Sequence, residues 1–217
     1  MDLDQLVHRH PRLFHMAAAG TWPSVREHGL LPTRTIVTTS GLPAPEQEQL
    51  LGHRRAGSTT VEHPRLGRVV LRDQGPLRLD LLELRLTDMT VPQWLDVLND
   101  RVFFWPDERR LDGLLAARRY RGSEHTVITL DTAGLVRAHE PNVRLSTINS
   151  GATLYPNAPP RGSQTFLRLS EHPAHGGRPL AELVVIGGVV DVAAHVVRVE
   201  RRRGGEVLGV LHERNRP

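Results

Sequence analysis

A single carboxylate lies in an apolar stretch near the C-terminal end of the sequence. Residues 179–188 read PLAELVVIGG, and Glu182 is the only charged residue among them. The β-branched residues and the closing glycine pair predict a buried strand. A buried carboxylate is costly unless a partner, a position at the rim or a chemical task compensates. Glu182 is therefore either a residue at the wet start of its strand or a working acid–base group.

A histidine and an arginine are the other candidates for chemistry. His15 lies in a short apolar strand at residues 13–16, just before a helix predicted over residues 21–30. Arg109 lies in the first turn of a helix predicted over residues 108–120. The positive end of the helix dipole disfavours a cation there. We expect Arg109 either to meet an anionic partner or to be exposed to solvent.

Aromatic side chains gather directly before that helix. A strand predicted over residues 101–106 contains Phe103, Phe104 and Trp105, three of the nine aromatic residues of the chain. Such a group can wall a binding pocket or pack in a core.

Composition excludes several classes of enzyme. The 217 residues include no Cys, which excludes disulfides, thiolate nucleophiles and iron–sulfur ligation. The net charge is +4 and every basic side chain is Arg, which is typical of a codon bias and weakens the case for nucleic-acid binding. The arginine clusters at residues 118–121 and 201–203 are expected to be solvated surface.

Neither a membrane segment nor a metal motif is found. No apolar run approaches the roughly 18 residues of a membrane span, and the start lacks a signal peptide, so we expect a cytoplasmic protein without a membrane partner. The histidine pairs His8/His10 and His172/His175 do not lie in a His-Glu-x-x-His frame, and we expect surface histidines there rather than zinc ligands.

The order of predicted elements indicates an α+β fold with a largely antiparallel sheet and short helices. We expect one domain over residues 1–217, with a polar, mobile insertion around residues 40–67. Neither a Gly-x-Gly-x-x-Gly fingerprint nor a P-loop occurs. Further helices are predicted at residues 4–10, 77–86, 90–99 and 132–139, and strands at 68–72, 126–130, 143–146, 164–169, 181–186, 196–199 and 207–211.

Three separated motifs resemble, in order, those of the DarT group of ADP-ribosyltransferases. The first resembles the opening histidine motif, the second an aromatic strand followed by an active-site arginine, and the third the strand of the catalytic glutamate. The chain is also similar to a bacterial family of uncharacterised DarT-like domains that shares the sequence VFFWP. The matching segments are residues 13–16, 22–25 and 29–30, then 102–106 with Arg109, then 181–185.

The resemblance implies a split, mostly antiparallel β-sheet that clasps NAD, the co-substrate. It implies cleavage of the nicotinamide glycosidic bond and transfer of ADP-ribose to a nucleic-acid or protein acceptor. Glu182 and Arg109 would be catalytic. Contacts to NAD would come from His15, Ser24, Phe103, Phe104 and Trp105.

Two departures from the family pattern leave alternatives open. The residues after Arg109 do not match, so Arg110 is an equal candidate for the active-site arginine. The threonine expected after His15 is missing, which favours a second reading, a nucleotide- or nucleic-acid-binding module without turnover. An NAD-consuming RNA 2′-phosphotransferase would suit the arginine-rich surface, but its further arginines are not found.

Overall fold

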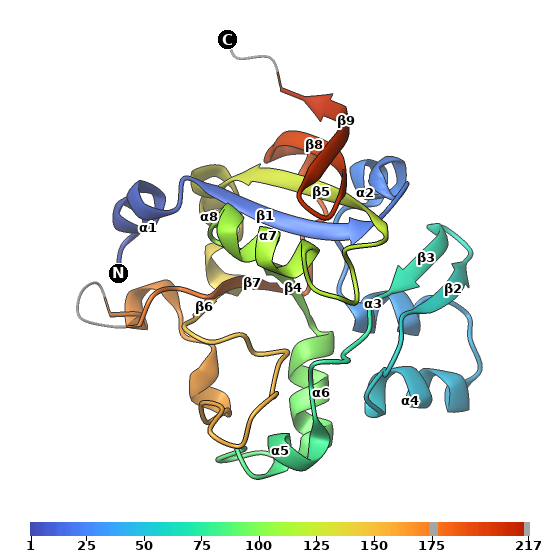
Figure 1. Cartoon of the computed structure of the whole chain (residues 1–217), viewed down its shortest axis with the longest axis vertical. Helices are drawn as coiled ribbons and strands as arrows, with labels where there is room; N and C mark the ends of the chain where they lie inside the picture. Colours follow the sequence, from blue (N-terminus) through green and yellow to red (C-terminus); the bar gives the residue numbers. More distant parts are fainter. Residues whose placement is uncertain (174–177, 215–217) are drawn as a thin grey trace.

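The computed structural model describes residues 1–173 and 178–214. It has an α+β fold, and every strand pair in its three described sheets is antiparallel, which confirms the predicted class. Figure 1 shows two larger sheets, one above the other in this view, with a small hairpin at the side. No helix of the described residues is long and apolar enough to cross a membrane.

The first sheet has the order β1-β5-β8-β9. Its last two strands form the predicted terminal hairpin around the glycine pair, and Gly204 has the positive φ of 54° that this turn requires. Both strands are longer than predicted. The bounds are β1 (Arg12–Ala18), β5 (Glu124–Asp131), β8 (Val196–Arg203) and β9 (Glu206–Glu213).

The second sheet has the order β4-β7-β6 and meets the first sheet at a single bridge. The strands are β4 (Arg101–Phe104), β6 (Val143–Ser146) and β7 (Glu182–Ile186). At the bridge, Phe14 and Trp105 each donate a backbone hydrogen bond of 2.9 Å to the other. The main core fills the space between the two sheets, because Leu13 and Ile128 of the first pack in one cluster with Leu183 and other residues of the second.

Eight α-helices surround the sheets in the described part of the chain, and their starts follow local sequence signals. Asp2 and Thr90 form capping boxes with a glutamine three residues later, and Asp107 and Asp131 each accept a backbone N–H of the first turn. The bounds are α1 (Leu3–Arg9), α2 (Trp22–His28), α3 (Thr33–Thr38), α4 (Ala44–Gly52), α5 (Leu79–Glu83), α6 (Val91–Asn99), α7 (Glu108–Leu115) and α8 (Thr132–His139).

The polar segment around residues 40–67 contains a helix and part of a hairpin, and it packs with its neighbours around a small apolar cluster. The strands β2 (Thr59–His63) and β3 (Gly67–Leu71) form a hairpin, and the first of them was not predicted from the polar sequence TTVEH. Val37 of α3, Val61 of β2 and Leu71 of β3 are buried together, with leucines of α4 packed against them. Burial of this apolar cluster contributes to the stability of a segment with a polar composition.

Three predicted elements are wrong or too long. Residues 164–169 do not form a strand: 3₁₀ turns lie at Ser163–Thr165 and Leu169–Glu171, and only Leu167 bridges to Leu145. In this segment Phe166 is buried, and its ring stacks on that of Trp94 of α6. The helices predicted over residues 77–86 and 108–120 are limited to α5 and α7.

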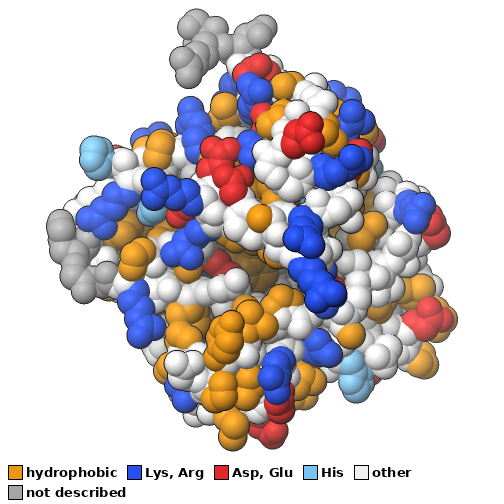
Figure 2. Space-filling model, viewed as in Figure 1, with side chains coloured by type: hydrophobic (Ala, Val, Ile, Leu, Met, Phe, Trp, Pro, Cys, Tyr) orange, Lys and Arg blue, Asp and Glu red, His pale blue; other side chains and the backbone are white. Residues whose placement is uncertain are grey.

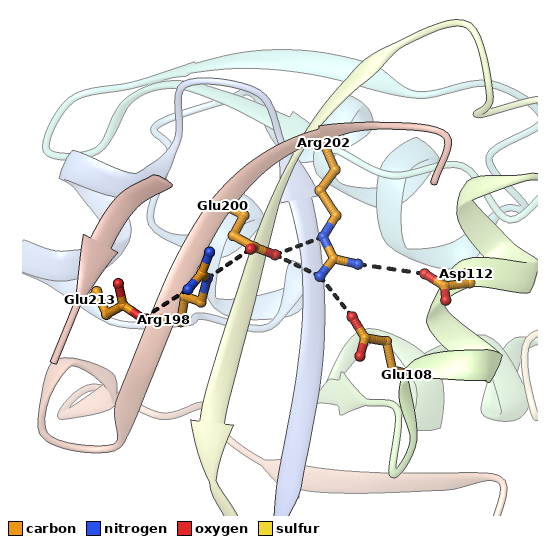
Figure 3. Close-up of polar contacts among 6 residues, drawn as sticks. All are labelled: Glu108, Asp112, Arg198, Glu200, Arg202 and Glu213. Carbon is orange, nitrogen blue, oxygen red and sulfur yellow. Dashed lines mark hydrogen bonds and ion pairs between the residues drawn. The ribbon is translucent and has the colours of Figure 1, made fainter. Parts of the chain in front are cut away.

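The arginine cluster of β8 is partly buried rather than solvated. Arg202 is 8% exposed and Glu200 is 4% exposed, and their side chains are joined by a hydrogen bond of 2.7 Å. Figure 3 shows that Arg202 also pairs with Glu108 and Asp112 of α7, while Arg198 pairs with Glu200 and Glu213. These charged contacts attach α7 to the outer face of the first sheet.

Candidate active site

Strand pairing places the three motif segments side by side. The bridge between Phe14 and Trp105 joins β1 to the end of β4, and Phe104 pairs with Leu183 of β7. Glu182 precedes Leu183 on β7, so its side chain points to the opposite face from Leu183. Trp105 follows the last residue of β4, and its side chain packs on the cluster that contains Phe14 and Leu111. The fold therefore brings the histidine, aromatic and glutamate strands into one neighbourhood.

Glu182 is a buried carboxylate at the first position of β7. It is 6% exposed, and its Oε2 accepts hydrogen bonds from Ser150, at 2.7 Å from Oγ and 3.2 Å from the backbone N–H. Burial raises the pKa of Glu182 to about 7, because removal from water disfavours the ionised form. The two hydrogen bonds from Ser150, and then the positive charges of Arg161 and Arg110, act in the opposite direction.

One oxygen of this carboxylate remains available to a ligand. Oε1 accepts no hydrogen bond from the described residues, and it is not fully buried.

Figure 2 shows a hollow near the centre of the molecule in this view. Comparison with Figure 1 places it over the second sheet, beside the loop between β6 and β7. Acidic, basic and apolar side chains surround the hollow. A carboxylate with a pKa near 7, such as Glu182, can serve as acid or base at neutral pH.

A second buried charge holds the loop that carries Ser150. Arg161 is 2% exposed and donates to the backbone carbonyls of Pro159, Asn149 and Ala152. Its guanidinium thus fixes both ends of the loop against each other, with Ser150 directed at Glu182. The sequence selects neither Ser150 nor Arg161. Both lie in residues 149–163, a stretch rich in Asn, Gly and Pro that indicates a loop but no particular functional residue.

Of the two candidate arginines, Arg110 is the one whose charge acts on Glu182. Asp107 accepts the backbone N–H of Arg110 at 3.0 Å and lies 3.4 Å from its Nε, which holds the side chain at the start of α7. Arg109 instead lines a separate surface pocket with Arg9 and His10. Neighbouring residues of a helix point about 100° apart, which explains the different surroundings.

His15 lies in the split between the sheets and does not share a face with Glu182. Its Nδ1 donates to the backbone carbonyl of Phe103 at 2.9 Å, and its ring lies 5.8 Å from that of Phe104. Burial lowers the pKa of His15 to about 4, so the ring is neutral near pH 7. Because Nδ1 carries the proton, Nε2 is a hydrogen-bond acceptor.

The remaining residues assigned to NAD have different surroundings. Phe104 is completely buried in the core between the sheets, so it packs against His15 and cannot wall an open pocket. Phe103 and Trp105 are each half-buried. The hydroxyl of Ser24 donates to the carbonyl of Leu66, at the turn between β2 and β3, at 3.2 Å.

Comparison with known proteins gives a family but no activity. No curated protein matches the chain. A family model described as a family of unknown function, DUF7002, matches residues 11–196, which include β1, β4, β7 and the loop of Ser150. Because this match spans most of the 217 residues, the chain belongs to the DUF7002 family.

Proposed function

We propose that the protein is an NAD-dependent ADP-ribosyltransferase in which Glu182 is the catalytic carboxylate. The observation that supports this most is a buried glutamate whose pKa is raised to about 7 and whose Oε1 accepts no hydrogen bond from the described residues. A split arrangement of antiparallel sheets is the architecture that the resemblance to the DarT group implies. Among the described residues, the backbone bridge between the two sheets is the one at Phe14 and Trp105, and this arrangement fits that architecture.

The reaction is a displacement at a sugar carbon. The bond between ribose C1′ and the nicotinamide nitrogen breaks, and its electron pair leaves with nicotinamide. A bond forms from C1′ to an acceptor nucleophile, whose proton passes to Glu182. Positive charge develops on the ribose in the transition state, and a carboxylate in a low-dielectric site stabilises it.

Each neighbouring side chain has a task in this scheme. Ser150 positions Oε2, so Oε1 is directed toward the ribose 2′-hydroxyl and the acceptor. Arg110 supplies the cation for the diphosphate of NAD, as arginine suits phosphate oxygens. Half-buried Trp105, which packs on the cluster of Phe14 and Leu111, offers an apolar surface to the nucleotide. His15 contributes its neutral Nε2, which accepts a hydrogen bond from a hydroxyl group at the other end of the extended dinucleotide.

A binding module without turnover is the second candidate. It is favoured by the position of His15, whose ring lies on the opposite face of the strands from Glu182. A nucleotide held only in the split between the sheets would contact His15 and leave Glu182 unused.

In the first candidate, the transferase, the acceptor of ADP-ribose is a nucleic acid or a protein.

The test measures nicotinamide release from NAD labelled in the nicotinamide ring, with mixed nucleic-acid and protein acceptors. We expect release by the wild type, its loss in Glu182→Gln, and no change in Glu83→Gln, a control at an exposed carboxylate of α5. Equal release by the wild type and Glu182→Gln would refute the catalytic role. Calorimetric binding of NAD without release would favour the binding module instead.

A further inference from the structure

Two chain segments cross between the sheets on their way through the fold, and both contribute to a cluster of metal-binding side chains. The first is α8, which connects β5 of the first sheet to β6 of the second. The second is the stretch of residues 187–195, which connects β7 of the second sheet to β8 of the first. His139 ends α8, and Asp191 and His195 flank the 3₁₀ turn Val192–Ala194.

The three side chains converge closely. One ligand atom from each lies within 4.8 Å of the others. The Nε2 of His139 is 2.7 Å from one carboxylate oxygen of Asp191, and the Nε2 of His195 is 3.1 Å from the other oxygen. The two imidazole rings are edge to face, with centroids 5.8 Å apart. Both histidine side chains are mostly buried, at 15% and 9% exposed, whereas Asp191 is 45% exposed.

We propose that His139, Asp191 and His195 bind one divalent transition-metal ion of the zinc class. Two imidazole nitrogens and one carboxylate oxygen suit zinc, cobalt or nickel, whereas magnesium and calcium prefer oxygen ligands. With bonds of about 2.0–2.1 Å, ligand atoms around a tetrahedral zinc lie roughly 3.3 Å apart, which small side-chain rotations reach from the present positions. The exposed side of Asp191 leaves the fourth position to water.

The ion would join the two crossover segments and so fix the relative orientation of the sheets. Glu182 begins the strand that leads into the second segment, and His15 lies at the other side of the split between the sheets. The site is distinct from the Glu182 site and does not depend on the proposed transferase activity. All three ligands fall within the region matched to the DUF7002 family.

The test uses the full chain without a histidine tag, treated with a chelator and then titrated with Co²⁺ or Zn²⁺. We expect one equivalent of Co²⁺ to give a visible absorption band that Zn²⁺ abolishes. At a free Zn²⁺ concentration of 100 times Kd, the Tm should rise by roughly 5–10 °C. Mg²⁺ should give no such shift.

The variants Asp191→Asn and His139→Gln should each weaken Co²⁺ binding at least tenfold, while His8→Gln, at an exposed histidine of α1, should bind as the wild type does. Thermal unfolding of the metal-free variants checks that they are folded. Absence of a Co²⁺ band in the wild type, or an equal band in folded Asp191→Asn, would overturn the metal site.

Discussion

Replacement of Glu182 by Gln should make the protein more stable at alkaline pH and change little at acid pH. The folded state holds the pKa of Glu182 at about 7, against an ordinary value of 4.5. As pH rises from 4.5 to 7, the unfolded chain loses the proton first, so the folded state binds more protons and the free energy of unfolding of the wild type falls. The difference of 2.5 pKa units corresponds to about 3 kcal/mol once Glu182 is fully ionised.

The assay is urea unfolding or thermal unfolding of the wild type and Glu182→Gln at pH 5 and pH 8.5. All other titrating groups are common to both proteins, so their effects cancel in the difference. The advantage of Glu182→Gln should grow by about 3 kcal/mol between these pH values, or roughly 6–12 °C in Tm for a chain of this size. Glu83→Gln should show no such trend. If the difference in the free energy of unfolding between the wild type and Glu182→Gln is the same at both pH values, Glu182 is not desolvated and the reasoning fails.

Three further changes test particular contacts. Arg110→Gln should lower nicotinamide release at least about tenfold, and Arg109→Gln should leave it near the wild-type rate, because of these two arginines it is Arg110 whose charge acts on Glu182; the opposite ranking would assign the role to Arg109. Ser150→Ala removes the Oγ–H hydrogen bond that favours the carboxylate and leaves the one from the backbone N–H, so the acidic limb of the pH–rate profile, where Glu182 becomes protonated, should move to higher pH; a shift to lower pH would contradict this contact. Arg202→Gln should reduce the free energy of unfolding in urea by about 3–5 kcal/mol, since it leaves buried Glu200 without one partner; a loss below 1 kcal/mol would show that Arg198 compensates.

Local sequence signals predicted the elements that carry the motifs. The apolar run around Glu182 forms β7, and the caps at Thr90 and Asp107 mark the starts of α6 and α7. These features depend on neighbours along the chain, which is why a single sequence was sufficient for them.

The surroundings of Glu182 depend on contacts that local patterns do not contain. Ser150 and Arg161 reach it from a loop without periodicity, held by hydrogen bonds to backbone carbonyls. The face on which His15 lies follows from the register of β1 against β4, which no motif specifies. The pairing of His139 with Asp191 joins residues 52 positions apart for the same reason.

The most direct test of the central claim is the crystal structure of Glu182→Gln grown with NAD, since this variant should bind the dinucleotide without cleaving it. We expect the nicotinamide ribose to lie in the hollow beside Ser150, with its 2′-hydroxyl about 3 Å from the side chain at position 182. NAD bound away from position 182, or no NAD in crystals that contain it at saturating concentration, would contradict the assignment of Glu182 as the catalytic carboxylate.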